Sequence, residues 1–429
     1  MKSNKRFLFL LPLLLLTSCN FKYVYHIEGL DLGGGEEEEV DDGIDDAGTY
    51  NIKVWVDEKI KSLTEMQIQS FVSQSGGKYT INATVEPVSE GTAASSMLQD
   101  VQSGADIFCF AQDQLARLKV AGAVAKLTGT YATFIESKNS EDSVKAASIG
   151  SSIYAYPITS DNGYFLYYDK SVISDEDAKD MTKILAKCRS AGKTLNFEAR
   201  SNGFYAASYF LAMGCKSEWE LDEETGIFKS FDDTFSDDNG FIAAKGLKEL
   251  ADKEVVATNS QASKLGGTSA ALVSGVWEYE VALDRLKGNL GCAEMPSFTV
   301  DGVSHHLSSF DGYKLLGVKP QVDSKKASVC RKIAKFLTSE ECQTQRFKEV
   351  SWGPTNVNTS QRDEVKAHPG LAALYAQHEY ATQQGQCPGA WFVALSTAAK
   401  EITLDSTDDE IREILRKYKA GLPELLSED

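Results

Sequence analysis

Two short polar stretches near the start of the chain follow segments that the apolar pattern predicts as β-strands. Asp-Glu-Lys at 57–59 comes directly after the strand predicted over 51–56, and Ala-Gln-Asp at 111–113 follows the buried strand predicted over 106–110. Helical patterns separate these strands, which predicts a parallel sheet whose carboxyl ends meet at one edge. Because ligands bind at that edge, we expect a polar-ligand site there, with the candidate residues Asp57, Lys59, Gln112 and Asp113.

A further candidate, Asp161, lies in the segment 153–172, which reads IYAYPITSDNGYFLYYDKSV. The almost unbroken apolar and aromatic run at 164–168 is typical of a strand covered on both faces. The polar interruption at 159–163 indicates a passage between two apolar cores, and we interpret it as a hinge. An acid inside such a passage is unfavourable unless it has a partner, which makes Asp161 a candidate for function.

The elements that must position these residues fall into two α/β sets. Helix and strand patterns alternate up to the hinge and again from 175 onward, and the stretches 308–312 and 351–356 suit further crossings. A chain of 429 residues also exceeds one ordinary core and favours two domains. Capping boxes are expected at several helix starts: Ser62 with Glu65, Thr338 with Glu341, and Thr407 with Glu410.

The N-terminal residues predict export. Lys2, Lys5 and Arg6 precede the apolar run 7–16, which is about half of the ~20 residues that a membrane span needs. This predicts a signal peptide over 1–18, and Leu-Thr-Ser-Cys at 16–19 is similar to the lipobox of bacterial lipoproteins, with Cys19 as the lipidated residue. Acyl chains on Cys19 would hold the protein at a membrane. The Gly-rich and acidic segment 19–49 is predicted to be an extended tether.

Composition narrows the classes of partner. The formal net charge is −18 and Lys and Arg are not concentrated anywhere, which argues against nucleic acid. His305 and His306 are adjacent and in a strand would point to opposite faces, so no metal site or cofactor is predicted. After Cys19 the cysteines, at 109, 188, 215, 292, 330, 342 and 387, are odd in number. Export permits disulfides, and the pairs Cys188/Cys215 and Cys330/Cys342 stay open beside buried free thiols.

Several stretches together resemble extracellular solute-binding proteins of the family that includes maltose/maltodextrin-binding proteins, the receptor components of sugar ABC importers. They are GADIFCFAQDQLARLKVAGAVAKL at 104–127, YAYPITSDNGYFLYYDKSV at 154–172, TSAALVSGVWEYEVA at 268–282, SFDGYKLLGVKP at 309–320 and SWGPTN at 351–356. The wording of FAQDQL and SDNGYFLYYDKSV is similar to maltose-type receptors of Gram-positive bacteria.

The resemblance implies an α/β, two-lobe, periplasmic-binding-protein-like fold with discontinuous domains joined by about three hinge crossings. Lobe 1 would comprise 50–158 plus 309–353, and lobe 2 would comprise 160–307 plus 355–429. It further implies a monomer that binds an oligosaccharide of the maltose/maltodextrin class with high affinity, closes on it, and delivers it to the membrane permease subunits of an ABC importer.

The resemblance also assigns roles to individual residues. Aromatic faces stack on pyranose rings, and carboxylates and amides bind hydroxyls. The stacking positions are Phe110, Trp277, and Trp391 or Phe392. The hydroxyl partners are Gln112, Asp113 and Asp161, with Asn202, Phe204 and Tyr205 across the cleft. The chain departs from maltose receptors in having Ser396 where an arginine is expected, and Asp161 in place of a longer Glu.

Other interpretations stay open. Phe110 and Trp277 could be core residues, Asp113 could cap a helix, and Asp57 and Lys59 could be solvated turn residues. A surface glycosidase would need two carboxylates about 5–9 Å apart, for which Asp113, Asp161 and Glu278 are available. No second catalytic motif accompanies them, and we predict a receptor and not an enzyme. The ligand could also be another carbohydrate or small polar solute.

Overall fold

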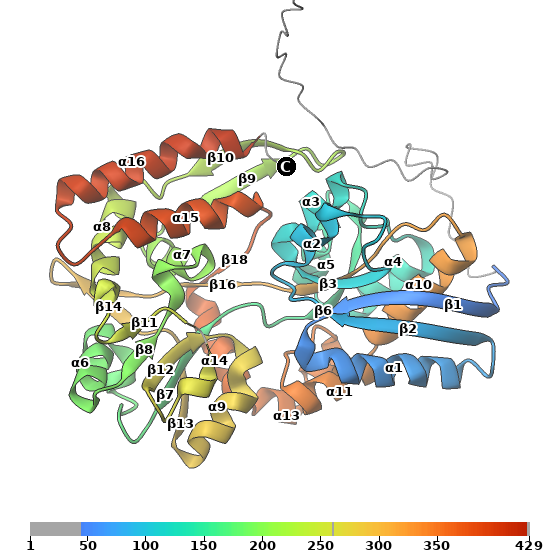
Figure 1. The fold of residues 1–429 in the computed structure, drawn as a ribbon, viewed down its shortest axis with the longest axis horizontal. Helices are drawn as coiled ribbons and strands as arrows, with labels where there is room; N and C mark the ends of the chain where they lie inside the picture. Colours follow the sequence, from blue (N-terminus) through green and yellow to red (C-terminus); the bar gives the residue numbers. More distant parts are fainter. Residues whose placement is uncertain (1–43, 260, 427–429) are drawn as a thin grey trace, which may run out of the picture.

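The computed structural model describes residues 44–259 and 261–426. Within these ranges the chain forms two five-stranded sheets that lie in separate halves of the molecule (Figure 1). The predicted signal peptide, Cys19 and most of the acidic tether fall outside the described residues. No helix in the described part is both long and apolar enough to cross a membrane.

The first sheet has the order β2-β1-β3-β17-β6. Its strands are β1 (Gly48–Val56), β2 (Tyr79–Pro87), β3 (Ile107–Ala111), β6 (Ala155–Thr159) and β17 (Lys314–Val318). The predicted parallel arrangement is confirmed for β1, β2 and β3, whereas β17 runs antiparallel to both β3 and β6. The helices of this half are α1 (Lys61–Gln74), α2 (Ala93–Gln99), α3 (Leu115–Val120), α4 (Gly129–Lys138), α5 (Glu141–Ala146), α10 (Ser324–Leu337) and α11 (Glu340–Val350).

The second sheet has the order β11-β8-β12-β7-β13 and is also mixed. Its strands are β7 (Phe165–Asp169), β8 (Thr194–Asn196), β11 (Val256–Ala257), β12 (Ser269–Ser274) and β13 (Leu290–Ala293). The helices here are α6 (Met181–Ala191), α7 (Gly203–Ala212), α8 (Asp238–Leu247), α9 (Tyr279–Leu286), α14 (Pro369–Gln377), α15 (Gly389–Glu401) and α16 (Asp408–Leu425). Two mixed sheets flanked by helices confirm the predicted α/β fold class.

Smaller elements complete the fold. The short strands pair as β4 (Ser148–Ile149) with β5 (Ser152–Ile153), β9 (Ser217–Leu221) with β10 (Phe228–Asp233), β14 (Ser297–Val300) with β15 (Val303–His306), and β16 (Ser309–Asp311) with β18 (Ala381–Gln383). The short helices α12 (Val357–Ser360) and α13 (Asp363–Lys366) follow the last predicted crossing.

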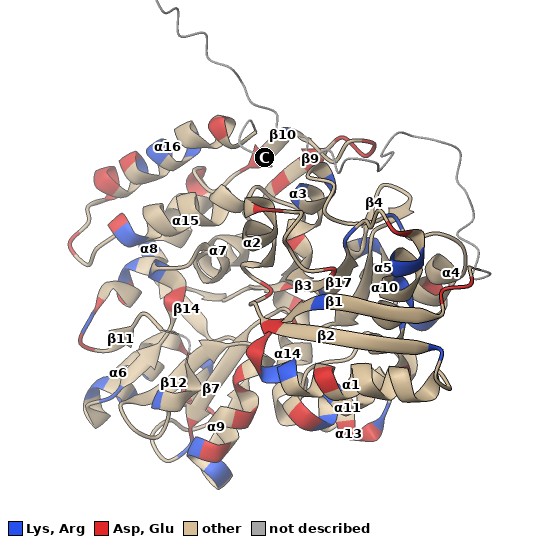
Figure 2. Ribbon diagram, turned by 45° about the vertical axis from the view of Figure 1, so that its right-hand side comes forward, with Lys and Arg blue, Asp and Glu red and all other residues tan. Residues whose placement is uncertain are grey.

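The three predicted crossings lie side by side between the two sheets (Figure 1). Ser160 N donates to Gly353 O at 2.9 Å, and Asn162 N donates to Gly312 O at 3.1 Å. The chain therefore passes between the halves through one hydrogen-bonded bundle. Figure 2 shows that Lys and Arg are interspersed with Asp and Glu over the helices of both halves.

The thiols from Cys109 to Cys387 form no disulfide in the described part of the chain, and all but Cys292 are buried. The open pairs Cys188/Cys215 and Cys330/Cys342 are therefore not bonded. Burial raises the pKa of the Cys109 and Cys342 thiols, and raises it to about 12 for Cys188, Cys215, Cys292 and Cys330.

Candidate functional site

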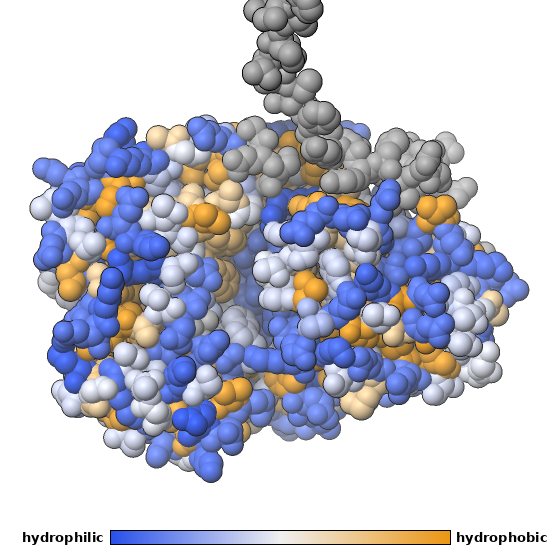
Figure 3. All heavy atoms as spheres, viewed as in Figure 1, coloured by the Kyte–Doolittle hydropathy of each residue, from blue (hydrophilic) through white to orange (hydrophobic). Residues whose placement is uncertain are grey.

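A cavity of about 700 Å³ lies between the two halves and receives side chains from both. Figure 3 shows the molecule hollowed between the halves on the face in view. The first half contributes Asp57, Lys59, Ser89, Glu90, Gly91, Ser95, Ala111, Asp113, Gln114, Arg117 and Lys314. The second half and the crossings contribute Asn162, Asn202, Phe204, Tyr205, Trp277, Trp352, Gln384, Gly389, Ala390, Phe392 and Val393.

The strand ends of the first sheet position the predicted polar residues. Asp57 directly follows β1 and accepts a hydrogen bond from Lys59 N at 2.8 Å, and both residues line the cavity. Asp113 follows β3, lines the cavity and accepts a hydrogen bond from Gln384 Nε2 at 3.0 Å. Asp113 does not cap α3, whose N-terminal flanking residue is Gln114. These side chains therefore share one sheet edge, as the strand pattern predicted.

An aromatic wall faces them from the second half. Trp277, in the turn before α9, is half-buried and lines the cavity together with Phe204, Tyr205 and Phe392. Asn202 caps α7 by accepting from Phe204 N at 3.0 Å, which orients the start of that helix toward the cavity. Phe204 stacks on Phe310 with ring centroids 5.4 Å apart. The wall thus consists of packed aromatic side chains, of which Phe204, Trp277 and Phe392 are partly exposed.

Trp277 owes its position to a glycine. A Cβ at Gly275 would lie 2.1 Å from the Trp277 ring, because the indole folds back over the backbone of residue 275. Only a residue without a side chain fits beneath the ring. The glycine in the sequence Gly-Val-Trp therefore allows the indole to line the cavity.

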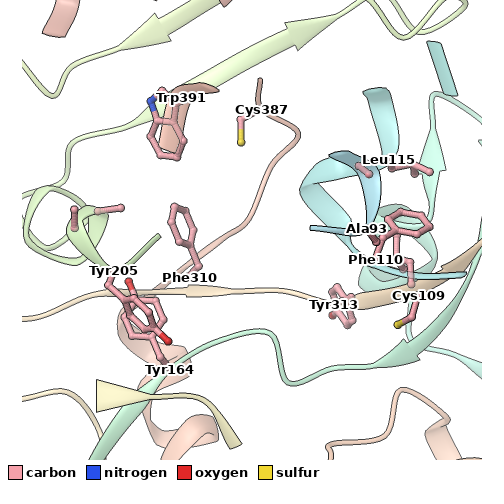
Figure 4. Close-up of a cluster of buried hydrophobic side chains, with 14 of the residues drawn as sticks. Ala93, Cys109, Phe110, Leu115, Tyr164, Tyr205, Phe310, Tyr313, Cys387 and Trp391 are labelled. Atoms are coloured by element: carbon pink, nitrogen blue, oxygen red, sulfur yellow. The ribbon is translucent and has the colours of Figure 1, made fainter. Parts of the chain in front are cut away.

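Four predicted site residues lie outside the cavity wall. Phe110 is fully buried in β3 and packs on Phe108 at 5.5 Å, because its side chain points to the covered face of the sheet (Figure 4). Gln112 lies behind the wall, where its Oε1 accepts from Tyr313 N at 2.7 Å and its Nε2 donates to Gln384 O.

Trp391 is the third of these residues. It is 3% exposed and its Nε1 donates to Tyr418 Oη at 2.8 Å, so it joins α15 to α16. Its ring lines a separate cavity of about 330 Å³ with Trp219 and Phe235. Phe392, the alternative to Trp391, is the one that faces the main cavity.

The fourth residue, Asp161, is fully buried at the junction of the crossings. Its Oδ2 accepts from Gly353 N at 2.8 Å, its Oδ1 accepts from Thr159 Oγ1 at 2.6 Å, and Lys314 Nζ lies 3.2 Å away. The partner that the sequence argument required for this acid is therefore supplied by the protein. Asp161 connects the first crossing to the third.

Several cavity residues were not anticipated. Lys314 begins β17, is 4% exposed, and lies with its Nζ 3.8 Å from the centroid of the Trp352 ring and 5.0 Å from that of Trp277. Glu90 and Arg117 also line the cavity. Lys314 and Trp352 belong to the stretches SFDGYKLLGVKP and SWGPTN, where a lysine in an apolar strand and a tryptophan in a crossing were available signals.

Burial shifts the pKa values of ionisable groups that line the cavity. It raises the pKa of Glu90 to about 7, although Lys314 opposes the shift, and it raises the pKa of Asp113 to about 6 against the effect of Arg117. Burial alone would lower the pKa of Lys314, but Asp161 and Glu90 outweigh it and the net direction is upward. The cavity therefore holds carboxyl groups that accept protons near neutral pH beside a fixed positive charge.

The two halves also touch beside the cavity. Lys59 Nζ forms an ion pair with Glu278 Oε1 at 2.8 Å and donates to Trp277 O at 2.6 Å. On the other side, Lys119 donates to the carbonyl oxygens of Glu223 and Glu224 in the turn between β9 and β10. The structure thus shows the two halves in contact around the cavity.

The chain matches the family described as bacterial extracellular solute-binding protein over residues 67–373. No curated protein sequence matches it. Among solved structures, it is similar to one determined with acarbose, at 25% identity and a TM-score of 0.76, covering 88% of this chain and 100% of that one.

Two further structures are similar in fold. One is the maltodextrin-binding protein MalE1 from L. casei BL23 without ligand, at 19% identity and a TM-score of 0.69, covering 89% of this chain and 100% of that one. The other is the GacH receptor of Streptomyces glaucescens GLA.O, at 18% identity and a TM-score of 0.70, covering 88% and 98%. With a match over most of its length, the chain belongs to the bacterial extracellular solute-binding protein family, whose members are receptors and not enzymes.

Proposed function

We propose that this protein is the extracellular receptor of a carbohydrate ABC importer and binds an oligosaccharide of the maltose/maltodextrin class in the main cavity. The observation that carries the proposal is the cavity itself, where Trp277, Phe204 and Phe392 face Asp57, Asp113 and Arg117. Aromatic faces suit the apolar side of a pyranose ring, and carboxylates, amides and a guanidinium suit its hydroxyls. Structures with a similar fold were solved with acarbose and maltotetraose, which supports this choice of class.

The arginine that the family resemblance expected at 396 has a functional substitute in this proposal. Arg117 lines the cavity from the first half, and Gly389 at the start of α15 is close enough that an added Cβ would lie 2.4 Å from Arg117 Nη1. A guanidinium therefore reaches the sugar site from the opposite wall. Its planar donors would bind ring and hydroxyl oxygens.

We further propose two lobes that close on the sugar, with lobe 1 formed by 50–158 plus 309–353 and lobe 2 by 160–307 plus 355–429. In support, the strands of the first sheet lie within 48–159 and 314–318, and those of the second lie within 165–293. A ligand that touches both lobes favours the closed form by its difference in affinity for the two forms. The permease subunits would then recognise that form.

Isothermal titration calorimetry of residues 20–429 with maltose, maltotriose and longer maltodextrins tests the ligand, with sucrose and lactose as unrelated disaccharides. We expect binding to an α-glucan and about a 5- to 150-fold loss in Trp277→Ala, since removal of a stacked ring costs about 1–3 kcal/mol. Tyr380→Ala is the control, because Tyr380 is an exposed aromatic residue outside the cavity. Equal losses in both variants, or no glucan binding, would contradict the proposal.

Lobe closure has its own test. Small-angle X-ray scattering should show a smaller radius of gyration with saturating maltotriose than without it. Unchanged dimensions at full saturation would reject closure but not sugar binding.

The attachment to the membrane is a separate proposal that rests on the sequence alone. Lipidation of Cys19 would hold the receptor at the outer face of the membrane, near its permease. Metabolic labelling with a radioactive fatty acid, compared between the full chain and Cys19→Ala, would detect the acyl chains.

A further inference from the structure

Two hydrogen-bond donors at the buried end of the main cavity lack acceptors. Lys314 Nζ and Trp352 Nε1 are both inaccessible to solvent, and neither has a hydrogen-bond partner among the described residues. The Trp352 side chain is 2% exposed and that of Lys314 is 4% exposed, yet both line the cavity. Asp161 Oδ1 is 3.2 Å from Lys314 Nζ and neutralises its charge, but this one oxygen can accept only one of the three protons of the ammonium group.

A second buried lysine, just beyond the opposite end of β17, shows what the protein does when a lysine is purely structural. Lys319 Nζ donates to three backbone carbonyls, of Val101, Gln102 and Gly104, at 3.1, 2.9 and 2.7 Å. Its ammonium is fully bonded within the fold, as buried polar groups usually are. Lys314 instead has two indole faces and one carboxylate around its ammonium group, and it lines the cavity.

The surrounding charges determine which chemical groups can bind beside Lys314 and Trp352. Asp161 offsets Lys314, while Glu90 and Asp57 lie on the same wall of the cavity and would repel an anion. A sugar hydroxyl satisfies both requirements, because its oxygen accepts from the lysine and the indole and its hydrogen is donated to a carboxylate. We propose that Lys314, Trp352 and Glu90 form a subsite for neutral hydroxyl groups, in which Lys314 and Trp352 donate and Glu90 accepts.

This inference rests on the proposed sugar-binding function, which it deepens by naming residues that select neutral over acidic sugars. Nuclear magnetic resonance of protein labelled with ¹⁵N-tryptophan tests it directly. The chain has five tryptophans, so each indole N–H signal can be assigned by single Trp→Phe variants. Before any sugar is added, the Trp352 indole proton should resonate upfield of those of Trp55 and Trp391, which donate at 2.8 Å to Glu86 and Tyr418, because a proton without an acceptor is less deshielded.

Maltotriose should then shift and protect the Trp352 signal and leave the Trp55 signal in place. In calorimetry, Trp352→Phe and Glu90→Gln should each weaken maltotriose binding about 3- to 30-fold, since the first removes one hydrogen bond to the ligand and the second replaces a carboxylate acceptor with a weaker amide acceptor. Lys319→Met is the matched control for Lys314→Met: the first should lower the melting temperature without changing affinity, and the second should lower affinity. Trp352→Phe keeps the test valid if Lys314→Met does not fold.

Each outcome bears on one proposal. A Trp352 indole proton that resonates as far downfield before sugar is added as that of Trp391 would overturn the subsite, because the donor would then have a partner in the protein. Stronger binding of trigalacturonic acid than of maltotriose, with a shift of the Trp352 signal, would overturn the selection of neutral groups. If maltotriose does not bind but the unliganded Trp352 proton resonates upfield, the maltodextrin assignment fails and the unfilled donors of the subsite are supported.

Discussion

At the level of single residues, the shape of the cavity depends on small groups that carry no chemistry of their own. Gly275 lets the Trp277 indole fold back over the backbone, so Gly275→Ala should displace the ring and weaken glucan binding by about 10-fold or more. The fold should be retained, because Trp277 is half-buried and free to move outward. Calorimetry with circular dichroism checks both statements. Gly288→Ala is the control, since nothing lies within 4 Å of a Cβ at that position; an equal loss there would refute the explanation.

Glu90 gives a pH dependence of stability. Burial raises its pKa from 4.5 to about 7, with Asp57 and Asp161 adding to the shift and Lys314 opposing it. The folded protein therefore binds more protons than the unfolded chain between these pH values, and the free energy of unfolding falls as pH rises through this window. Glu90→Gln removes the free-energy cost of ionising a buried carboxyl group. The variant should therefore be more stable than the parent at pH 8, by at most about 3 kcal/mol, and about equally stable near pH 4.5.

Urea denaturation at pH 5 and pH 8 measures this difference. Glu65→Gln is the control, because Glu65 is partly exposed and its ion pair with Lys61 lies within α1. A Glu90→Gln variant whose advantage does not grow with pH would show that the carboxyl group is ionised at little cost.

The sequence predicted which residue types lie at the site better than it predicted the directions in which their side chains point. Asp57, Asp113, Trp277 and Phe392 line the cavity as expected from strand ends and the family resemblance. Phe110 does not, because alternate residues of a strand point to opposite faces and an all-apolar strand gives no sign of which face is open. Lys314 was missed because a lysine in an apolar strand needs partners from distant crossings, here Asp161 and Trp352.

At the level of elements, close packing of α7 on α15 places the aromatic wall. A Cβ at Gly203 would lie 2.2 Å from Phe392 O and 2.7 Å from Phe392 Cα, so the two helices meet backbone to backbone. Gly203→Ala should force them apart, with a loss of about 1–3 kcal/mol in the free energy of unfolding and weaker sugar binding through Phe204 and Phe392. Thermal and urea denaturation measure the loss.

Gly421→Ala in α16 is the control, and we expect it to change the free energy of unfolding in the opposite direction. Gly421 is exposed, and nothing lies within 4 Å of a Cβ there. Gly421→Ala should therefore stabilise the protein by about 0.5–1 kcal/mol through helix propensity. Similar losses in both variants would exclude helix contact as the cause.

Helix starts were predictable where the signal was local and complete. The capping box of Thr407 and Glu410 is confirmed at the start of α16. The box of Ser62 and Glu65 was wrong, since α1 already begins at Lys61 after the turn that Asp57 caps. At α11 the capping side chain is Ser339 and not Thr338. The antiparallel pairing of β17 with β6 could not be predicted either, because it joins segments that are more than 150 residues apart in the sequence.

At the level of the whole molecule, the ion pair between Lys59 and Glu278 joins the two halves beside the cavity. Both residues are partly exposed, so the pair contributes about 0.2–1 kcal/mol to the arrangement in which the two halves touch. Lys59→Met should weaken maltotriose binding about 2- to 5-fold and increase the unliganded radius of gyration. The effect should shrink in 1 M salt, which screens the pair.

Lys61→Met is the matched control, because Lys61 pairs with Glu65 in its own helix. Calorimetry and small-angle scattering at low and high salt give the comparison. Salt-independent losses in Lys59→Met would assign its effect to the bond with Trp277 O instead of to the charge pair.

The burial of the thiols gives the protein a set of internal reporters. The buried Cys109, Cys330 and Cys342 lie in the half of the first sheet, and the buried Cys188 and Cys215 in the half of the second. Burial raises the pKa of each, so a thiol reagent reaches them only when the surrounding structure opens. Pulsed labelling followed by mass spectrometry would therefore show which half of the receptor unfolds first, without the introduction of a single foreign probe.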